Sequence, residues 1–280
     1  MVKNGFEATV GAWAAQLSAN EKTPATREKY VRAVRAFAAW LGARPAGRAE
    51  LLLYKAYIER RYTPAGVNGI LAALHSYFAF CGKAAWRVKT VKTGRRLFAA
   101  AGRELGKAEY QSLLTAAAKK GNTRLWLLLQ TMCATGVRVS EVAYITVECL
   151  AAGCVTVHNK GKYRTVFLPR QLCRSLQGYC KKRGITAGPV FVTRGGKPLD
   201  RSNIHHEMKK LAPAAGVEKA KVFPHNLRHL FARTHYAAHK DIGKLADLLG
   251  HSNVNTTRIY LMESGETHRR QIEHLGLLVC

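Results

Sequence analysis

A basic, glycine-containing stretch from Arg87 to Gly106 divides the chain into two parts with different local patterns. Its apolar residues show little of the periodicity that marks helices and strands, whereas regular patterns precede and follow it. Such a break is typical of a linker between domains. Because 280 residues suffice for two domains of ordinary size, we predict a first domain at residues 1–86, a basic linker at 87–104 and a second domain at 105–280.

The first domain is predicted to be a bundle of helices. Apolar residues recur at helical spacing in 26–41 and again in 67–78, and the second stripe follows a helix-start signal at Thr63-Pro64. The apolar faces are expected to form the core. The polar side of the 26–41 helix carries basic residues that are candidates for a surface function: Arg27, Lys29, Arg32 and Arg35.

The second domain has mixed patterns. Residues 125–134 are apolar on nearly all sides, which predicts a buried helix. Two β-rich runs, 155–157 and 165–168, flank Asn159-Lys160-Gly161-Lys162, which predicts a hairpin with a basic turn. A further short strand is expected at 189–193, and helices follow from residue 201 onward. The predicted fold class is therefore mainly α, with a small antiparallel β-sheet in the C-terminal domain.

The charge of the chain predicts a polyanionic partner. There are 45 Lys and Arg against 17 Asp and Glu, a formal net charge of +28, and these residues are spread along the chain. Nucleic acid is the first candidate, because neutralising phosphates releases counterions. An anionic membrane surface is the alternative. With 48% hydrophobic residues, each part can build a core.

The remaining composition favours a cytoplasmic protein without a metal or cofactor. The seven cysteines include no Cys-x-x-Cys pair and no zinc-site spacing, so reduced thiols are expected. The N-terminal residues do not resemble a signal peptide, and the longest apolar stretch, 125–134, is too short to cross a bilayer. No Gly-x-x-x-x-Gly-Lys phosphate loop is present.

Two short motifs place arginines where a phosphate could bind. On a helix beginning at Pro224, His225 and Arg228 lie three apart and share a face near the positive end of the helix dipole. In the motif TGVRVSE, Arg138 lies at the start of a helix, where the dipole disfavours a cation. Either Glu141 pairs with this guanidinium, or the guanidinium reaches an anion; both hold if Glu141 orients Arg138 toward a phosphate. Taken alone, each motif also fits an ordinary solvated face.

Three further residues are candidates for proton transfer and nucleophilic attack. Lys160, in the hairpin turn, is either an exposed surface lysine or an acid that protonates a leaving oxygen. His251 follows the helix cap at Gly250, and Tyr260 comes nine residues later. A tyrosine becomes a nucleophile when a base takes its proton and cations hold the electrophile. A buried aromatic with a satisfied hydroxyl is the alternative for Tyr260.

Together these motifs resemble the tyrosine recombinase (phage integrase) family. The order is Arg in TGVRVSE, Lys in a β-hairpin turn, His-x-x-Arg in HNLRH, and LLGH nine residues ahead of a tyrosine. The resemblance is strong over roughly residues 105–265 and extends to the N-terminal half as a helical core-binding domain. Four ordered motifs are far more specific than any one of them.

The resemblance implies a role for each candidate. Tyr260 is the expected nucleophile, Arg138 and Arg228 the clamp on the scissile phosphate, and His225 the proton shuttle. His251 would donate a hydrogen bond to the phosphate, Glu141 would support the site, and Lys160 would act as general acid. The turn is one residue shorter than the Gly-Lys-Gly-x-Lys-x-Arg pattern often found in the family, so Lys162 is the alternative acid.

DNA contacts are expected from Arg27, Lys29, Arg32, Arg35, Lys89, Lys92, Arg95, Arg96, Lys162 and Arg164. A merely solvated tether fits the linker cations among these equally well.

The implied function is site-specific DNA recombination through a 3′-phosphotyrosine intermediate and a Holliday junction. No metal, cofactor or ATP is required, because two Arg, one Lys and two His can align and stabilise phosphoryl transfer. The expected partner is double-stranded DNA with an inverted-repeat core site, bound by a homotetramer that is a monomer or weak oligomer when free, in the bacterial cytoplasm and associated with the nucleoid. Integration and excision of a mobile element are favoured. Chromosome or plasmid dimer resolution, a non-catalytic DNA-binding protein and a type IB topoisomerase-like enzyme are the alternatives.

Overall fold

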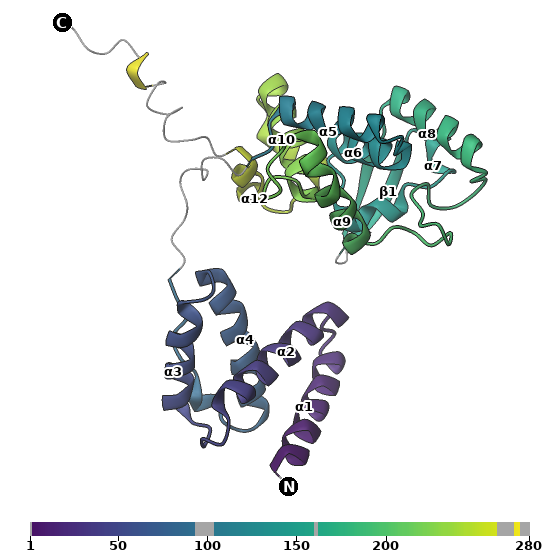
Figure 1. Ribbon diagram of the computed structural model, residues 1–280. Coiled ribbons are helices and arrows are strands. Elements are labelled where there is room, and N and C mark those ends of the chain that lie inside the picture. Colours follow the sequence, from purple (N-terminus) through teal and green to yellow (C-terminus); the bar gives the residue numbers. More distant parts are fainter. Residues whose placement is uncertain (1, 93–103, 160–161, 262–271, 275–280) are drawn as a thin grey trace, which may run out of the picture. The chain divides into compact units, whose positions relative to one another are not determined.

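The structure, a computed structural model, describes residues 2–92, 104–159, 162–261 and 272–274 (Figure 1). The chain forms two compact units, Met1–Arg95 and Arg96–Cys280, each with its own hydrophobic core. Their boundary falls inside the stretch predicted as a linker. The beginning of that stretch packs on the first unit, because Val88 is only 3% exposed and belongs to its core.

Helices and a short 3₁₀ turn make up the first unit: α1 (Val2–Ala19), α2 (Pro24–Leu41), α3 (Arg48–Glu59), α4 (Pro64–Phe80) and η1 (Ala84–Trp86). Two of these helices begin in the same way. The hydroxyls of Thr23 and Thr63 each accept a backbone N–H of the first turn at 3.3 Å, and a proline follows directly. Proline suits this position because the N–H it lacks has no partner inside the helix.

Aromatic rings dominate the core of the first unit. Trp13 on α1 meets Tyr77 on α4 at a centroid distance of 5.2 Å, and Phe37 on α2 meets Tyr54 on α3 at 5.0 Å, both edge to face. Edge-to-face packing is the arrangement that the ring quadrupoles favour. Phe37 also meets Phe78 of α4 at 5.8 Å, so aromatic contacts join the four helices into one bundle.

The second unit holds most of the secondary structure: α5 (Lys107–Lys119), α6 (Thr123–Thr135), η2 (Val139–Tyr144), α7 (Cys149–Ala152), β1 (Cys154–Asn159), β2 (Lys162–Phe167), α8 (Arg170–Arg183), α9 (Arg201–Leu211), η3 (Ala212–Ala215), α10 (Pro224–His239), α11 (Ile242–Leu249), α12 (Val254–Arg258) and η4 (Ile259–Leu261). The predicted fold class, mainly α with a small antiparallel sheet, is confirmed.

The two strands form the predicted hairpin. They pair antiparallel from Cys154 opposite Phe167 to Asn159 opposite Lys162. The strand expected at 189–193 is absent from the described residues, where only isolated bridges occur, between Thr146 and Pro189 and between Val192 and Pro198. Each bridge contains a proline, which has no N–H with which to continue a ladder.

Helix α6 lies in the core of the second unit and fixes the location of the candidate residues. Its apolar side chains are buried, and the hydroxyls of Thr131 and Thr135 donate to the carbonyls of Leu127 and Thr131 at 2.8 and 2.6 Å. Helix α10 packs directly against α6. The end of α6, from which Arg138 follows, is therefore brought to the helix that carries the His-x-x-Arg motif.

Within the described ranges, no helix is both long enough and apolar enough to cross a membrane. The six cysteines described there are all free thiols.

Candidate active site

Arg138 is held at the junction between α6 and η2. Gly136 ends α6 in the left-handed conformation (φ +61°), and Arg138 caps η2. The carboxylate of Glu141 accepts the backbone N–H of Arg138 at 2.8 Å through Oε2 and its Nη1 at 2.8 Å through Oε1. A side chain three residues along thus fixes both the main chain and the guanidinium of Arg138, as a capping box would.

Glu141 is shared between two arginines. Its side chain is 1% exposed, and its Oε2 also accepts Nη2 of Arg164 on β2 at 2.6 Å. Burial alone would raise the pKa of Glu141, but the hydrogen bonds from Arg164 and Arg138 outweigh it and lower the pKa. The carboxylate is therefore ionised and joins η2 to the hairpin.

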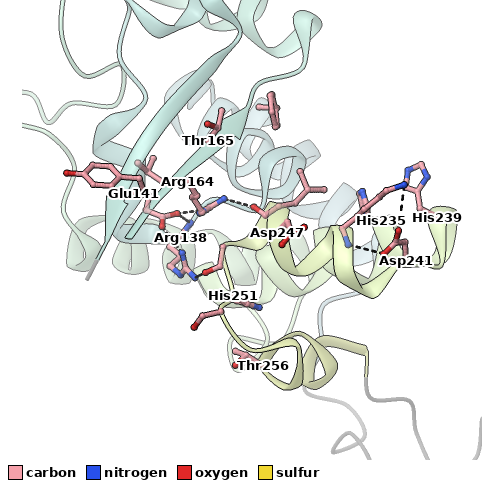
Figure 2. A pocket seen from close by; sticks show the side chains of 17 residues that line it. Arg138, Glu141, Arg164, Thr165, His235, His239, Asp241, Asp247, His251 and Thr256 are labelled. Atoms are coloured by element: carbon pink, nitrogen blue, oxygen red, sulfur yellow. Dashed lines mark hydrogen bonds and ion pairs between the residues drawn. The ribbon is translucent and has the colours of Figure 1, made fainter. Parts of the chain in front are cut away.

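The C-terminal end of α11 is a meeting point for three guanidiniums, of which Figure 2 shows those of Arg138 and Arg164. The carbonyl of Leu248 accepts Nη1 of Arg164 at 2.6 Å, that of Leu249 accepts Nη2 of Arg228 at 2.7 Å, and that of Gly250 accepts Nη2 of Arg138 at 3.3 Å. The last carbonyls of a helix lack partners within the helix and carry its negative dipole end. These carbonyls therefore accept hydrogen bonds from Arg164 on β2, from Arg228 on α10 and from Arg138, which caps η2.

Arg228 is almost completely buried, at 2% exposure. Its Nη1 donates to the carbonyl of Gly136, which links α10 to the end of α6. Burial and the nearby charge of Arg138 lower its pKa to about 10, although contact with the Tyr260 hydroxyl raises it in part. Its Nε–H is buried and has no hydrogen-bond partner among the described residues. An unsatisfied buried donor beside a second cation is what an incoming phosphate oxygen would satisfy.

His251 connects Arg228 to α12. Its Nε2 lies 3.1 Å from Nη2 of Arg228 and its Nδ1 lies 2.9 Å from the hydroxyl of Thr257. Burial, together with the charges of Arg228, Arg138 and Arg164, lowers the pKa of His251 to about 4. The ring is therefore neutral at pH 7. Since a guanidinium only donates, Nε2 accepts and the ring proton lies on Nδ1.

Tyr260 lies among the histidines. It is 5% exposed, and its ring stacks on His251 with an interplanar angle of 9° and a centroid distance of 5.5 Å. His229 meets the ring edge-on at 4.3 Å, and His225 lies at 5.5 Å. The contact of the hydroxyl with Arg228 raises the pKa of that guanidinium. Residues from the HNLRH and LLGH motifs thus meet the tyrosine within one chain.

The two histidines of α10 next to Tyr260 are neutral at pH 7. Burial, with the charges of Arg228 and Arg138, lowers the pKa of His225, and burial with neighbouring cations lowers that of His229 to about 3. Neighbouring groups desolvate part of the imidazole, but the residue retains solvent-accessible surface. Because it is unprotonated and accessible, it can accept a proton.

The site opens into a groove of about 1240 Å³ (Figure 2). Arg138, Glu141, Arg164 and His251 line one part of it, and His235, His239 and Asp241 line another part. Residues of the hairpin and of α11 complete the walls. The groove thus exposes the guanidinium of Arg138, whose side chain is 30% exposed, to a ligand from solvent.

The structure brings together five of the six residues predicted to be catalytic: Arg138, His225, Arg228, His251 and Tyr260. Lys160 lies outside the described residues, and only the backbone of Lys162, at the start of β2, is described. The choice between these lysines as general acid stays a prediction.

Among the predicted DNA contacts, Lys29, Arg32, Arg35, Lys89 and Lys92 are exposed, Arg27 is half-buried, and Arg95 and Arg96 lie outside the described residues. Arg35 also pairs with Glu7 at 2.7 Å. Arg164 differs from these exposed residues, and its contact with DNA stays a prediction. Its side chain is 9% exposed, and its guanidinium is held by Glu141 and the carbonyl of Leu248, so it supports the site from inside.

Two neighbours of the site were not predicted. His229, which is not among the candidates above, contacts Tyr260, and Thr257 holds Nδ1 of His251. Helical spacing offered a signal for the first, because His229 follows His225 by four residues and shares its face. No pattern in the sequence indicates the second contact.

Comparison with known proteins identifies the family to which the chain is similar. Residues 103–266 match the phage integrase family. The tyrosine recombinase XerA of Thermococcus kodakarensis is 32% identical over 268 residues, covering 92% of this chain and 91% of the relative. The tyrosine recombinase XerD of Xanthomonas campestris pv. campestris is 30% identical, with 89% and 84% covered. Among solved structures, a lambda integrase dimer bound to a COC′ core site has a TM-score of 0.72 at 17% identity, with 92% of this chain and 96% of that chain covered, which shows the same fold.

The chain therefore belongs to the phage integrase family. It is an enzyme of the tyrosine recombinase class, which transfers DNA strands, so the predicted family and activity are confirmed.

Proposed function

We propose that this chain performs site-specific recombination by cleaving each DNA strand with Tyr260, which forms a 3′-phosphotyrosine and releases a 5′-hydroxyl. One observation carries this assignment. The ring of Tyr260 stacks on His251, whose Nε2 lies 3.1 Å from Nη2 of Arg228, and Arg138 donates to the carbonyl of Gly250, the residue before His251. A nucleophile close to two cations is the arrangement that phosphoryl transfer requires.

In this mechanism Arg138 and Arg228 bind the non-bridging oxygens of the scissile phosphate. Arg228 has five N–H donors, of which Gly136, Leu249 and His251 engage three. The Nε–H has no hydrogen-bond partner among the described residues, and this mechanism assigns it to the phosphate. Because the guanidinium is buried and fixed, it stabilises the charge that develops on those oxygens without reorganising.

The proton of Tyr260 passes to His225. A bond forms between the tyrosine oxygen and phosphorus while the bond from phosphorus to the 5′-oxygen breaks, and Lys160 protonates that leaving oxygen. His225 suits the base role, because its lowered pKa keeps the imidazole neutral at pH 7. Rejoining is the same step in reverse, with a 5′-hydroxyl from the partner strand as the nucleophile.

His251 changes its role when DNA binds. In the structure its Nε2 accepts from Arg228 and therefore cannot donate. A phosphate placed beside it adds negative charge, which raises the pKa of the imidazole and favours protonation of Nε2. The protonated ring then donates to a phosphate oxygen, while Thr257 continues to hold Nδ1.

Substitution of the nucleophile tests the mechanism. With a nicked suicide substrate, Tyr260→Phe is expected to abolish the covalent protein–DNA complex and leave DNA binding intact. Tyr236→Phe is the matched control, because Tyr236 packs against the same small apolar cluster. Covalent complex or strand joining by Tyr260→Phe contradicts the proposal. Relaxation of supercoiled DNA without sequence preference would favour a topoisomerase-like enzyme.

The general acid is tested with the same substrate. Lys160→Ala is expected to block cleavage, and Lys162→Ala is expected to retain it. A 5′-bridging phosphorothiolate substrate needs no acid and should restore cleavage by the variant that lacks the acid, because sulfur leaves without protonation. If only Lys162→Ala blocks cleavage, Lys162 is the acid.

We propose assembly of a homotetramer on paired inverted-repeat core sites, with integration and excision of a mobile element as the outcome. Dimer resolution uses the same active site, and recombination assays with attachment-like repeats from the flanking DNA distinguish integration and excision from dimer resolution.

The apolar residues near the C-terminus are expected to support assembly. Of these, Ile272 is 67% exposed, and Leu275, Leu277 and Leu278 lie outside the described residues. Deletion of 271–280 should weaken the tetramer and spare DNA binding, and an unchanged tetramer fraction contradicts this.

A further inference from the structure

Arg164 is the one guanidinium of the cluster at the end of α11 that the proposed mechanism does not use. It is more deeply buried than Arg138, with a side chain 9% exposed against 30%. Its two terminal nitrogens are engaged, Nη1 with the carbonyl of Leu248 at 2.6 Å and Nη2 with Glu141 at 2.6 Å. Two short, charge-assisted contacts in fixed directions match the planar fork of an arginine and suit no other side chain.

The charge balance around Glu141 gives the first reason for this arrangement. One carboxylate faces two guanidiniums, so the group of Arg138, Arg164 and Glu141 retains one net positive charge. Without Arg164, the buried carboxylate would have Arg138 as its only cationic partner, and the pair would be neutral. Arg138 would then be drawn to Glu141, and its attraction to a phosphate would fall.

The backbone contact gives the second reason. Arg164 joins β2 to the last turn of α11, two residues before Gly250 and three before His251. The packing there is close, because a Cβ at Gly250 would lie 2.3 Å from Cδ of Arg164. The side chain therefore fixes the turn whose carbonyls hold Arg138 and Arg228 and from which His251 projects.

We propose that Arg164 is a positioning residue for DNA cleavage. It shares the charge of Glu141, so that Arg138 keeps its positive charge for the phosphate, and it anchors the α11 turn. This inference rests on the proposed function, since it concerns the same site. In this role Arg164 acts through Glu141 and the α11 turn and not on the reacting atoms.

Single-turnover cleavage of the suicide substrate tests the inference. Arg164→Met is expected to slow formation of the Tyr260–DNA complex by about 100-fold, the loss typical of a displaced catalytic group, at unchanged DNA affinity. Adding Glu141→Gln should restore part of the rate, because it removes the charge that captures Arg138. A purely structural role predicts the opposite, since a second buried substitution would lower the rate further.

Two controls keep the outcome clear. Arg124→Met removes an arginine that likewise bonds a carboxylate, Glu207, and a carbonyl, Val192, but at the other end of α6, and it should cleave at the wild-type rate. Arg164→Lys retains the charge but has only one donor group, so it should fold and cleave about tenfold slower than wild type. That variant decides the question if Arg164→Met does not fold.

The inference is overturned if both Arg164 variants cleave like wild type, if the loss of rate follows a loss of DNA affinity, or if Glu141→Gln fails to restore any rate to Arg164→Met. Failure of the proposed function looks different. In that case the wild-type protein itself forms no Tyr260-dependent covalent complex.

Discussion

The two units of the molecule use charged side chains in opposite ways. In the first unit, Arg35 and Glu7 form an ion pair whose side chains are 56% and 52% exposed. In the second, Glu141 is 1% exposed and Arg164 9% exposed, and Arg228 is buried with its donors on backbone carbonyls. An exposed pair is screened by water and salt, whereas a buried one is held in a single geometry.

The comparison separates two properties that the high net charge alone does not distinguish. Exposed cations attract DNA without regard to their exact orientation, because the attraction comes largely from the release of counterions. Buried cations contribute geometry, because their positions are fixed by carbonyls at the ends of α6 and α11. The cations of the first unit are therefore expected to determine mainly the affinity for DNA, and those of the second unit the rate of DNA cleavage.

Among the substitutions that test this comparison between the two units, the largest effect is expected for Arg228→Lys. One ammonium group cannot serve the carbonyls of Gly136 and Leu249 together with a phosphate. We expect the single-turnover cleavage rate to fall about 10²- to 10³-fold, as for loss of a fixed donor to a developing anion, with DNA affinity little changed. A fall in affinity as large as the fall in rate would break the distinction between the two units.

Gly136→Ala tests how closely the side chains pack at the end of α6. The residue has φ +61°, and a Cβ there would lie 2.5 Å from Cδ1 of Phe231. A left-handed conformation alone costs about 1–2 kcal/mol for alanine, and the clash adds to it. Thermal unfolding should show a clear loss of stability. Gly216→Ala is the control, because Gly216 has φ +64° but open space around its Cβ position, and an equal loss in both would exclude a role for the Phe231 contact.

Acid should destabilise the second unit through its buried histidines. Folding lowers the pKa of His229 from 6.5 to about 3, so the unfolded chain binds a proton more readily between these values. The free energy of unfolding is then complete above pH 6.5 and falls as the pH decreases through this window. The slope of the free energy of unfolding against pH measures the number of protons taken up on unfolding. In His229→Gln this number should decrease by about one. Urea unfolding at several pH values measures it, with the exposed His206→Gln as control, and an unchanged slope contradicts the buried position.

The smallest effect is expected at the exposed surface of the first unit. Arg32→Ala should weaken DNA binding modestly at all sequences and reduce the slope of log affinity against log salt by about one. Arg35→Ala should reduce it less, because Glu7 already neutralises part of that charge. Fluorescence anisotropy at several salt concentrations measures both slopes. Equal slopes for the two variants would show that the Glu7 pair has no influence on DNA binding.

Much of the fold could be predicted because its signals are local. The start of α4 at Pro64, the hairpin strands and the buried helix α6 follow from apolar spacing and from proline and glycine positions. The strand expected at 189–193 was wrong, because apolar character alone does not show that prolines on the paired residues prevent a ladder.

The candidate site could be predicted as a set of residues but not as a set of contacts. The order of the motifs identified Arg138, Arg228, His251 and Tyr260 as candidates. The structure brings these residues together. Sequence spacing could not assign Arg164, because its partners, Glu141 and the carbonyl of Leu248, lie 23 and 84 residues away. It therefore looked like one more surface cation on a basic hairpin.

By itself, the sequence determined the helical and strand segments, the basic character and the residues able to transfer a phosphoryl group, since each depends on side-chain type and on spacing along a few turns. Only the tertiary structure decided which cations face solvent and which are buried. That choice depends on carbonyls at the ends of α6 and α11, and a backbone carbonyl has the same chemistry at every position until folding leaves it without a partner.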